Sequence, residues 1–362
     1  MRDKGETNIE IENLDLGQGH FDVIDYSDGN LLVSGWMLNP EIDFNSFAIY
    51  IDHCKYQLCT TIKREDVGKA FPDIPHANNT GFSFSLDISI DRMNKNLDIC
   101  VIGLSQDKEI AKIRTYYNQI QNKLVPPEKL ILRIGGGFEN VGNEFLRYFI
   151  DIGKIKSNAK ILDVGCGCGR MAVPLIGYLD ERGSYDGFDI IPEGIIWCQE
   201  NITKIFPKFK FQLADVYNKE YNPSGAIDAS KYTFPYNDDS FDFVFLTSVF
   251  THMLPQEIEN YFSEITRVLK KDGICMSTFF LLNRESLELI NSKSSSLDFK
   301  YGPGKYLTVS KDNPESAIAY DELYVRGIYD IYNLNIIGPI YYGGWCGRNK
   351  YLSYQDCIIA KR

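Results

Sequence analysis

Short apolar stretches of six or seven residues recur through the first third of the chain, with turn residues between them. They are rich in β-branched and aromatic side chains, and no helical stretch separates them. Runs of this length and composition are typical of β-strands, and several in succession favour a sandwich. We therefore expect a small all-β, sandwich-like domain at 1–117, with strands at 30–36, 46–52, 56–62, 81–86 and 97–102.

The pattern changes beyond a polar stretch that ends in Pro126 and Pro127. Apolar stretches now alternate with helical ones, which indicates βαβ units around a parallel sheet. Strands are expected at 160–164, 184–188, 209–213, 241–246 and 274–280, and two more near 334–338 and 356–360. The sequence thus predicts an α/β domain at 130–362, joined to the first domain by a linker at 118–129.

The best-marked helix is expected between the fourth and fifth of these strands. Pro255 suits its first turn, and Gly273 can end it. Its apolar residues fall on one face at helical spacing, which predicts packing against the sheet. They are Ile258, Phe262, Ile265 and Leu269.

A glycine-rich turn follows the first strand of the α/β domain and precedes a helix expected at 171–179. Gly165, Gly167 and Gly169 stand at alternate positions, where they let a ligand approach the strand end closely. The helix start offers unpaired N–H groups. Asp163, two residues before the turn, suits the cationic amino group of a methionine moiety better than a pyrophosphate. This spacing disfavours a nicotinamide dehydrogenase.

Two further acids end the neighbouring strands. Asp189 ends the second strand, where an acid can accept both ribose hydroxyls. Asp215 and Val216 follow the third strand, where they can touch an adenine edge. Singly, each acid could as easily cap a turn or a helix. Together with Asp163 they lie where open α/β sheets bind ligands, which predicts a binding site.

The stretch 161–281 resembles class I S-adenosylmethionine-dependent methyltransferases in its glycine motif, its strand-end acids and its F-D-x-V fourth strand. The resemblance covers roughly 130–362. It implies a Rossmann-like α/β fold, with a seven-stranded sheet, helices on both faces and an antiparallel last strand. It also implies S-adenosylmethionine as the cofactor. The cofactor contacts that it implies are Asp163, Gly165, Cys166 and Gly167, Asp189 and Ile190, Asp215 and Val216, and Thr247.

An upstream element, Arg133 to Gly137, is similar to one that meets the cofactor carboxylate in many relatives. Arg133 and Gly135 are therefore added to the expected cofactor contacts. A surface ion pair is the other interpretation of Arg133.

His252, just past the fourth strand, is the candidate general base. It stands at the rim where cofactor and acceptor meet in such folds, and histidine accepts a hydroxyl proton near neutral pH. The alternative is a histidine that hydrogen-bonds a backbone carbonyl or the next helix start. An amine acceptor would need less help from a base.

The acceptor pocket is expected among the least regular segments near the end of the chain. Aromatic side chains beside glycines and an arginine can stack on and hydrogen-bond a sugar. Packing within a long hairpin loop is an equal alternative. The candidate substrate-binding residues are Tyr320, Tyr342, Trp345 and Arg348.

The first domain carries short motifs that are similar to β-domains of bacterial enzymes that build or decorate surface glycans. The motifs include Gly35-Trp36, the stretch 64–72 and Gly81-Phe82. They favour a sugar or glycan-linked acceptor.

The net charge of −11 argues against a nucleic-acid partner, since such binders show a basic stripe. No apolar window approaches the ~18 residues of a membrane span, and residues 1–14 do not form a signal peptide. The nine cysteines show no C-x-x-C pair, and the four histidines stand far apart. We therefore expect a cytoplasmic protein with reduced thiols and no metal site.

These features predict a two-domain, S-adenosylmethionine-dependent methyltransferase that acts on oxygen of a sugar or glycan-linked acceptor. One alternative is a small-molecule N-methyltransferase. The other is a non-catalytic protein that binds the cofactor and a glycan.

Overall fold

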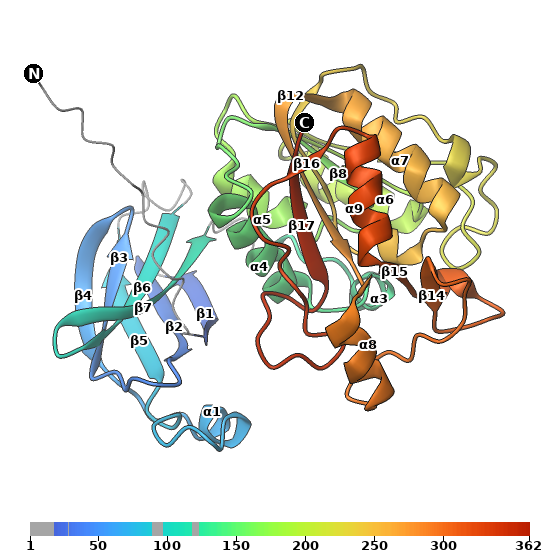
Figure 1. Ribbon diagram of the computed structural model, residues 1–362. Helices are drawn as coiled ribbons and strands as arrows, with labels where there is room; N and C mark the ends of the chain where they lie inside the picture. The colour runs from blue at the N-terminus through green and yellow to red at the C-terminus, as the bar shows by residue number, and fades with distance from the viewer. Residues whose placement is uncertain (1–17, 28, 89–96, 118–122) are drawn as a thin grey trace, which may run out of the picture. The chain divides into compact units, whose positions relative to one another are not determined.

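The computed structural model describes residues 18–27, 29–88, 97–117 and 123–362. The chain divides into two compact units, Met1–Lys123 and Leu124–Arg362 (Figure 1). The segment 1–14, where no signal peptide is expected, lies outside the described residues, as does part of the predicted linker, 118–122. The last part of that linker belongs to the second unit, where α3 begins at Glu128.

The first unit contains two antiparallel sheets whose side chains share one core. One sheet has the order β1-β2-β5 and the other β4-β3-β6-β7. Phe47 of β3 and Phe82 of β5 lie 5.4 Å apart, centroid to centroid, and so join the two sheets. The predicted β-rich N-terminal region is confirmed. Its elements are β1 (Gln18–Ser27), β2 (Asn30–Leu38), β3 (Ser46–Ile51), β4 (Cys54–Thr60), α1 (Glu65–Ala70), β5 (Gly81–Asp87), β6 (Leu97–Ser105) and β7 (Lys108–Tyr117).

The second unit is built on a mixed sheet of order β10-β9-β8-β11-β12-β17-β16. The first five of these strands are parallel, while β17 runs antiparallel to both of its neighbours. The predicted α/β fold with a mixed sheet and helices is confirmed. The strands are β8 (Lys160–Val164), β9 (Ser184–Asp189), β10 (Phe209–Leu213), β11 (Phe241–Leu246), β12 (Leu269–Phe279), β16 (Asn335–Ile336) and β17 (Asp356–Lys361).

Helices cover this sheet, with α4 and α5 on one side and α7 and α9 on the other (Figure 1). A small three-stranded sheet, absent from the sequence-based prediction, follows β12. Its strands are β13 (Leu281–Leu282), β14 (Tyr306–Thr308) and β15 (Ile318–Asp321). The helices are α3 (Glu128–Arg133), α4 (Phe138–Asp151), α5 (Ala172–Tyr178), α6 (Pro192–Cys198), α7 (Pro255–Val268), α8 (Arg284–Asn291) and α9 (Glu322–Ile331), with short helical turns η2 (Gln199–Thr203), η3 (Ala229–Lys231), η4 (Phe250–His252) and η5 (Pro314–Ser316).

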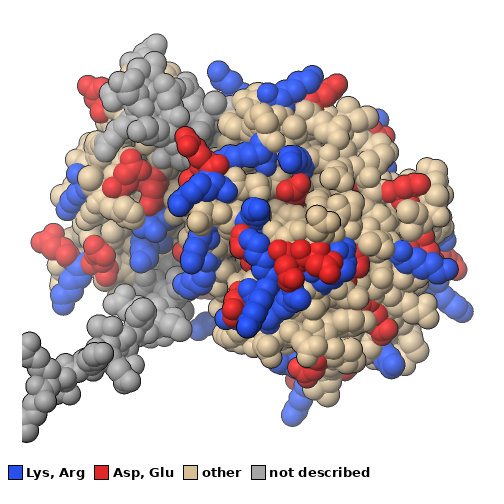
Figure 2. Space-filling view, turned by 90° about the horizontal axis from the view of Figure 1, so that it is seen from above, with Lys and Arg blue, Asp and Glu red and all other residues tan. Residues whose placement is uncertain are grey.

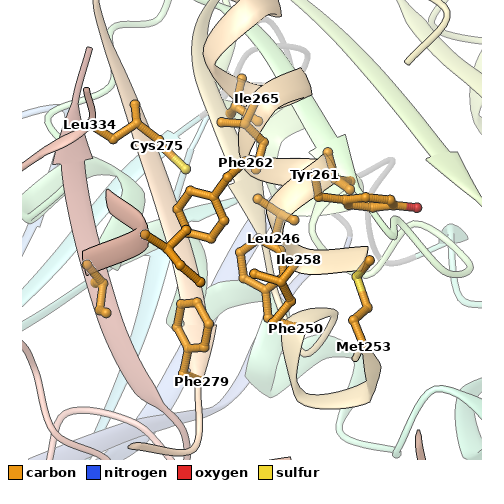
Figure 3. Close-up of a cluster of buried hydrophobic side chains, with 14 of the residues drawn as sticks. Leu246, Phe250, Met253, Ile258, Tyr261, Phe262, Ile265, Cys275, Phe279 and Leu334 are labelled. Atoms are coloured by element: carbon orange, nitrogen blue, oxygen red, sulfur yellow. The ribbon is translucent and has the colours of Figure 1, made fainter. Parts of the chain in front are cut away.

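Helix α7 packs the predicted apolar face on the sheet (Figure 3). Ile258, Phe262 and Ile265 are buried there. The helix ends earlier than predicted, because Leu269 pairs with Phe241 and already belongs to β12. Gly273 therefore lies inside a strand rather than at the helix end.

Acidic and basic side chains are intermingled on the face that Figure 2 presents. The basic residues around the end of α7 are also paired with acids. Arg267 pairs with Glu264 and Asp238, and Lys270 pairs with Asp242.

Candidate functional site

A cavity of about 170 Å³ opens at the carboxyl ends of β8, β9 and β11. It brings together residues predicted from five separate stretches of the sequence. The predicted site residues that line it are Arg133, Asp163, Gly165, Cys166, Gly167, Asp189, Ile190, Val216, Thr247 and His252.

The glycine turn after β8 forms one wall of the cavity. Gly165 has φ +82°, and a Cβ atom there would lie 2.4 Å from Cγ2 of Val249. The N–H groups of Gly165 and Cys166 both donate to the carbonyl of Phe188 at the end of β9. The turn is thus fixed to the neighbouring strand, and only glycine fits at its first position.

Asp163 offers one unpartnered oxygen. The residue is fully buried, and Tyr185 donates its hydroxyl to Oδ2 at 2.5 Å. Oδ1 has no hydrogen-bond partner among the described residues. Burial raises the pKa of this carboxyl to about 8, and the Tyr185 hydrogen bond opposes that rise. A buried acceptor without a donor suits a cationic amino group, as the sequence predicts.

Asp189 ties the glycine turn to the loop after β9. Its Oδ2 accepts the N–H of Gly167 at 2.7 Å, and its Oδ1 accepts the N–H of Ile191 at 2.8 Å. Each carboxylate oxygen can accept a further hydrogen bond. The side chain is buried and lines the cavity, so it can also receive the hydroxyls of a ribose.

Two predicted cofactor contacts, Asp215 and Gly135, lie outside the cavity lining. Asp215 is exposed, and its Oδ1 accepts the N–H of Ala226 at 3.0 Å. Its backbone carbonyl accepts the N–H of Ile227. Asp215 thus closes the loop 215–227, and its neighbour Val216 reaches the cavity instead.

Two guanidinium groups line the cavity, and the sequence prediction named only Arg133. Its Nη1 pairs with Glu193 at 3.4 Å, and its Nη2 donates to the carbonyl of Tyr221. The ion-pair interpretation of Arg133 therefore describes its contacts. Arg170, which directly follows the glycine motif, is half-buried and donates through Nη1 to the carbonyls of Ile134 and Gly136.

His252 lies in η4, which aromatic packing holds against α7 and β12. Phe250 stacks on Phe262 and on Phe279 at 5.2 and 5.0 Å between ring centroids. His252 Nδ1 lies 2.8 Å from the carbonyl oxygen of Glu315. A carbonyl can only accept, so Nδ1 carries the proton and Nε2 keeps its lone pair. Burial lowers the pKa of this imidazole, which favours its neutral form.

Glu257 is a cavity residue that the sequence prediction missed. It stands in the first turn of α7, where its Oε2 accepts the N–H of Leu254 at 2.5 Å. Burial raises the pKa of its carboxyl to about 7. The only available signal was an acid three residues after the N-cap residue Leu254, which is typical of an ordinary cap.

The four candidate substrate-binding residues do not line the cavity. Each is held by other protein groups. The Tyr320 hydroxyl donates to the carbonyl of Met253, and Tyr342 donates to Glu322. Trp345 is fully buried and donates Nε1 to Asp356, which also pairs with buried Arg348. Packing of the loop, the alternative weighed for these residues, accounts for their contacts.

Hydrogen bonds hold the segment 217–222 against the segment 312–316 beside the cavity. The N–H of Lys219 donates to Oε2 of Glu315 at 3.0 Å, and its Nζ donates to the carbonyl of Asp312. Asn313 donates its amide to Glu220. Tyr217, Asn218 and Tyr221 of the first segment line the cavity, so these bonds set the position of that wall.

The described residues contain no cluster of histidines, cysteines and acids that could hold a metal ion. In the same part of the chain, every helix is too short or too polar to cross a membrane.

Residues 155–320 match the model of a family described as a methyltransferase domain. A probable cobalt-precorrin-6B C(15)-methyltransferase (decarboxylating) of Thermoplasma acidophilum is 27% identical over 147 residues, which are 40% of this chain and 62% of that protein. The match thus spans less than two thirds of the relative's length.

Two solved structures are similar to the chain. A protein from Pyrococcus horikoshii OT3 is 17% identical with a TM-score of 0.40, over 68% of this chain and 92% of that one. A SAM-dependent methyltransferase from Aquifex aeolicus is 18% identical with a TM-score of 0.39, over 67% of this chain and 96% of that one.

The chain therefore carries a methyltransferase domain that includes residues 155–320. The predictions of a methyl-transferring enzyme domain and of S-adenosylmethionine as its cofactor are confirmed.

Proposed function

We propose that the protein transfers the methyl group of S-adenosylmethionine to a hydroxyl oxygen of a sugar or glycan-linked acceptor. The observation that carries this proposal is the tautomer of His252. Nδ1 donates to the carbonyl of Glu315, so Nε2 faces its surroundings as a free base. An alcohol must lose its proton as the methyl arrives, and a neutral imidazole is suited to take it.

The cofactor supplies a methyl group on a sulfonium, which is displaced in line by the acceptor. The protein's task is to bind, orient and remove one proton. Asp163 Oδ1 would hold the amino group of the methionine end, and Asp189 the ribose hydroxyls. Val216 would lie along the adenine. His252 Nε2 would then accept the hydroxyl proton.

The glycan part of the proposal rests on the first unit. We assign residues 1–117 to acceptor recognition, 118–129 to a linker and 130–362 to catalysis. The residues that resemble glycan-modifying enzymes lie close together in the fold. The ring of Trp36 lies 5.9 Å from that of Phe71, and Arg64 pairs with Asp66 at 2.6 Å. A cytoplasmic site of action belongs to the same proposal, since the cysteines are unpaired.

A mass-based acceptor screen tests the proposal. The full chain is incubated with trideuteromethyl-labelled cofactor and three acceptor sets: sugars with glycan oligosaccharides, primary and secondary amines, and tetrapyrroles. The tetrapyrrole set is included because the Thermoplasma relative is named for a precorrin. We expect a labelled O-methyl product in the sugar set alone.

The controls are two variants of the second unit. His252→Gln should abolish most of the product, whereas Arg284→Gln, an exposed change on α8 outside the cavity lining, should leave it unchanged. A labelled amine or a carbon-methylated tetrapyrrole as the main product would replace the proposed acceptor class. Cofactor binding without any product would favour the non-catalytic alternative.

A further inference from the structure

A second carboxyl of the cavity, besides that of Asp163, has an oxygen that the protein does not use. Glu257 lines the cavity from the first turn of α7, and its Oε2 accepts the N–H of Leu254 at 2.5 Å. Its Oε1 has no hydrogen-bond partner in the part of the chain that the structure describes. The helix cap therefore occupies one oxygen, and the other remains available to a ligand in the cavity.

The groups around Glu257 do not balance the charge of its ionised form. Burial is the main cause that raises the pKa of this carboxyl to about 7, and the charges of Glu315 and Asp228 add to the rise. The N–H of Leu254 opposes it. Among the described residues, the groups that shift this pKa include no cation. A cationic ligand would supply the missing counter-charge.

Two aromatic rings line the cavity together with Glu257 and the candidate base. Burial raises the pKa of the Tyr261 hydroxyl, and the charge of Glu257 is near enough to add to that rise. The ring of Tyr221 lies 5.5 Å from that of His252, centroid to centroid. Aromatic faces pack on sugar rings and attract cations. This part of the cavity thus combines a base, an open carboxyl and two rings.

We propose that Glu257 binds an ammonium group of the acceptor, so that the acceptor is a sugar with a free amino group. Oε1 of Glu257 would hold the amino group while a hydroxyl of the same sugar meets Nε2 of His252. This inference rests on the proposed function, because it names the class of sugar whose oxygen is methylated.

The chain between the two side chains is held in place before an acceptor arrives. His252 is bonded through Nδ1 to the carbonyl of Glu315, and the carbonyl of Met253 accepts the Tyr320 hydroxyl. Glu257 then fixes Leu254 through the cap. The base and the carboxyl therefore keep a set separation. An ammonium has no lone pair, so the same contact would protect the nitrogen and leave the hydroxyl as the nucleophile.

Binding of matched sugars to the full chain, saturated with S-adenosylhomocysteine, tests the proposal. The probes are methyl glucosides with one amino group, at carbon 2, 3, 4 or 6, and the same compounds with that group N-acetylated. We expect at least one amino glucoside to bind roughly 10- to 100-fold more tightly than its N-acetylated form in calorimetry, as for one charged hydrogen bond. Glu257→Gln should reduce this ratio to within about 3-fold, because its amide still accepts the Leu254 N–H but carries no charge.

Glu259→Gln is the matched control, because it makes the same change in the same helix at an exposed residue outside the cavity lining. It should keep the ratio of the original protein. Equal binding of the amino and N-acetylated forms, or no binding of any of these sugars, overturns the proposal. A ratio that persists in Glu257→Gln also overturns it, because another group would then hold the amine.

If Glu257→Gln does not fold, chemical coupling in the original protein decides the matter. A water-soluble carbodiimide activates a carboxyl, and an amine in contact with it then forms an amide. Peptide mass spectrometry should locate the preferred amino glucoside on Glu257, and linkage to a different acid would overturn the proposal.

The labelled product separates this inference from the proposed function. Equal O-methylation of amino and N-acetylated glucosides would keep the proposed function and remove the role of Glu257. An amino glucoside that is preferred in binding but receives no methyl group would keep Glu257 as the amine-binding residue and contradict the proposed function. A methyl group on the amino nitrogen would overturn both.

Discussion

The backbone carbonyl of Glu315 accepts a hydrogen bond from Nδ1 of His252 at 2.8 Å, while the Glu315 side chain accepts the N–H of Lys219 at 3.0 Å. One buried residue of η5 thus fixes the tautomer of the candidate base and the adjoining wall of the cavity, where the Tyr221 ring lies 5.5 Å from that of His252, centroid to centroid. The position of the segment 217–222 and the chemistry of His252 are linked through this residue.

Replacement of His252 should affect turnover and not cofactor binding. We expect His252→Ala to lower kcat by roughly 10²- to 10⁴-fold, the usual range for a general base, with an almost unchanged Kd for S-adenosylhomocysteine. Because the base form is the neutral imidazole, kcat should fall as pH falls through the His252 pKa. Burial lowers that pKa, so the midpoint should lie below the usual 6.5. Near-normal turnover of the variant would remove His252 from the mechanism.

Replacement of Glu315 should loosen the segment 217–222. Glu315→Ala removes the acceptor of the Lys219 N–H but keeps the backbone carbonyl that meets His252. We expect faster amide hydrogen exchange in 217–222 and a lower kcat, with the His252 midpoint little changed. Glu288→Gln, which changes the exposed ion pair with Arg284 on α8, is the control. Unchanged exchange in 217–222 would contradict a role for Glu315 in holding this wall.

Replacement of Asp163 should have opposite effects on the free energy of unfolding and on cofactor affinity. Its pKa is about 8 in the folded chain against 3.8 when unfolded, because burial disfavours the charged form. Between these values the folded state holds the extra proton, so this residue makes stability fall as pH rises from about 4 to 8. Asp163→Asn should therefore raise the free energy of unfolding at pH 8, on the order of 1–3 kcal/mol.

The same variant should lose cofactor affinity, since an amide cannot match the ammonium as a carboxylate does. In the original protein, S-adenosylhomocysteine binding should tighten from pH 6 to 8 as Asp163 ionises. That trend should flatten in Asp163→Asn. A destabilised Asp163→Asn variant would mean that Asp163 is ionised without the ligand. A variant that keeps the full pH trend in binding would mean that another group causes this trend.

The central parallel strands β8 and β11 were predictable because they are largely buried and appear as apolar runs, whereas the edge strand β10 alternates apolar and polar residues at its start. β8, β10 and β11 have the bounds that the sequence predicts. β7 was missed because charged residues such as Lys108 and Lys112 alternate with its buried ones. The sheet of β13, β14 and β15 was missed because its strands have two to four residues and pair over long separations.

The cofactor side of the cavity was predictable because the glycine turn and two strand-end acids lie at fixed positions of the fold. The rest depends on which way a side chain points, which local sequence does not determine. Trp345 is held inside by Asp356, and Arg170, just after the glycine motif, lines the cavity although it was not predicted to do so. Asp215 is turned away by its bond to Ala226.

The two units should fold separately, because each has a core made of its own residues. The core of the first unit draws on both of its sheets, and the largest core of the second surrounds α7. Every residue that lines the cavity lies between Arg133 and Tyr261. A chain that begins at Leu124 should therefore melt cooperatively and bind S-adenosylhomocysteine within about 3-fold of the full chain. Residues 1–123 alone should give a β-rich circular dichroism spectrum and a cooperative melt.

What the shortened chain should lose is the use of large acceptors. If the first unit holds a glycan near the catalytic unit, its removal ends the gain from a second, tethered contact. KM for an oligosaccharide acceptor should then rise by 10-fold or more, on the order expected for lost avidity, while KM for a monosaccharide should stay the same. If the KM for the oligosaccharide is the same in the shortened chain as in the full chain, the first unit has no part in acceptor recognition. The shortened chain could also be insoluble or fail to bind the cofactor. The first unit would then be part of the catalytic core, because its residues would be needed for the second unit to fold although they do not line the cavity.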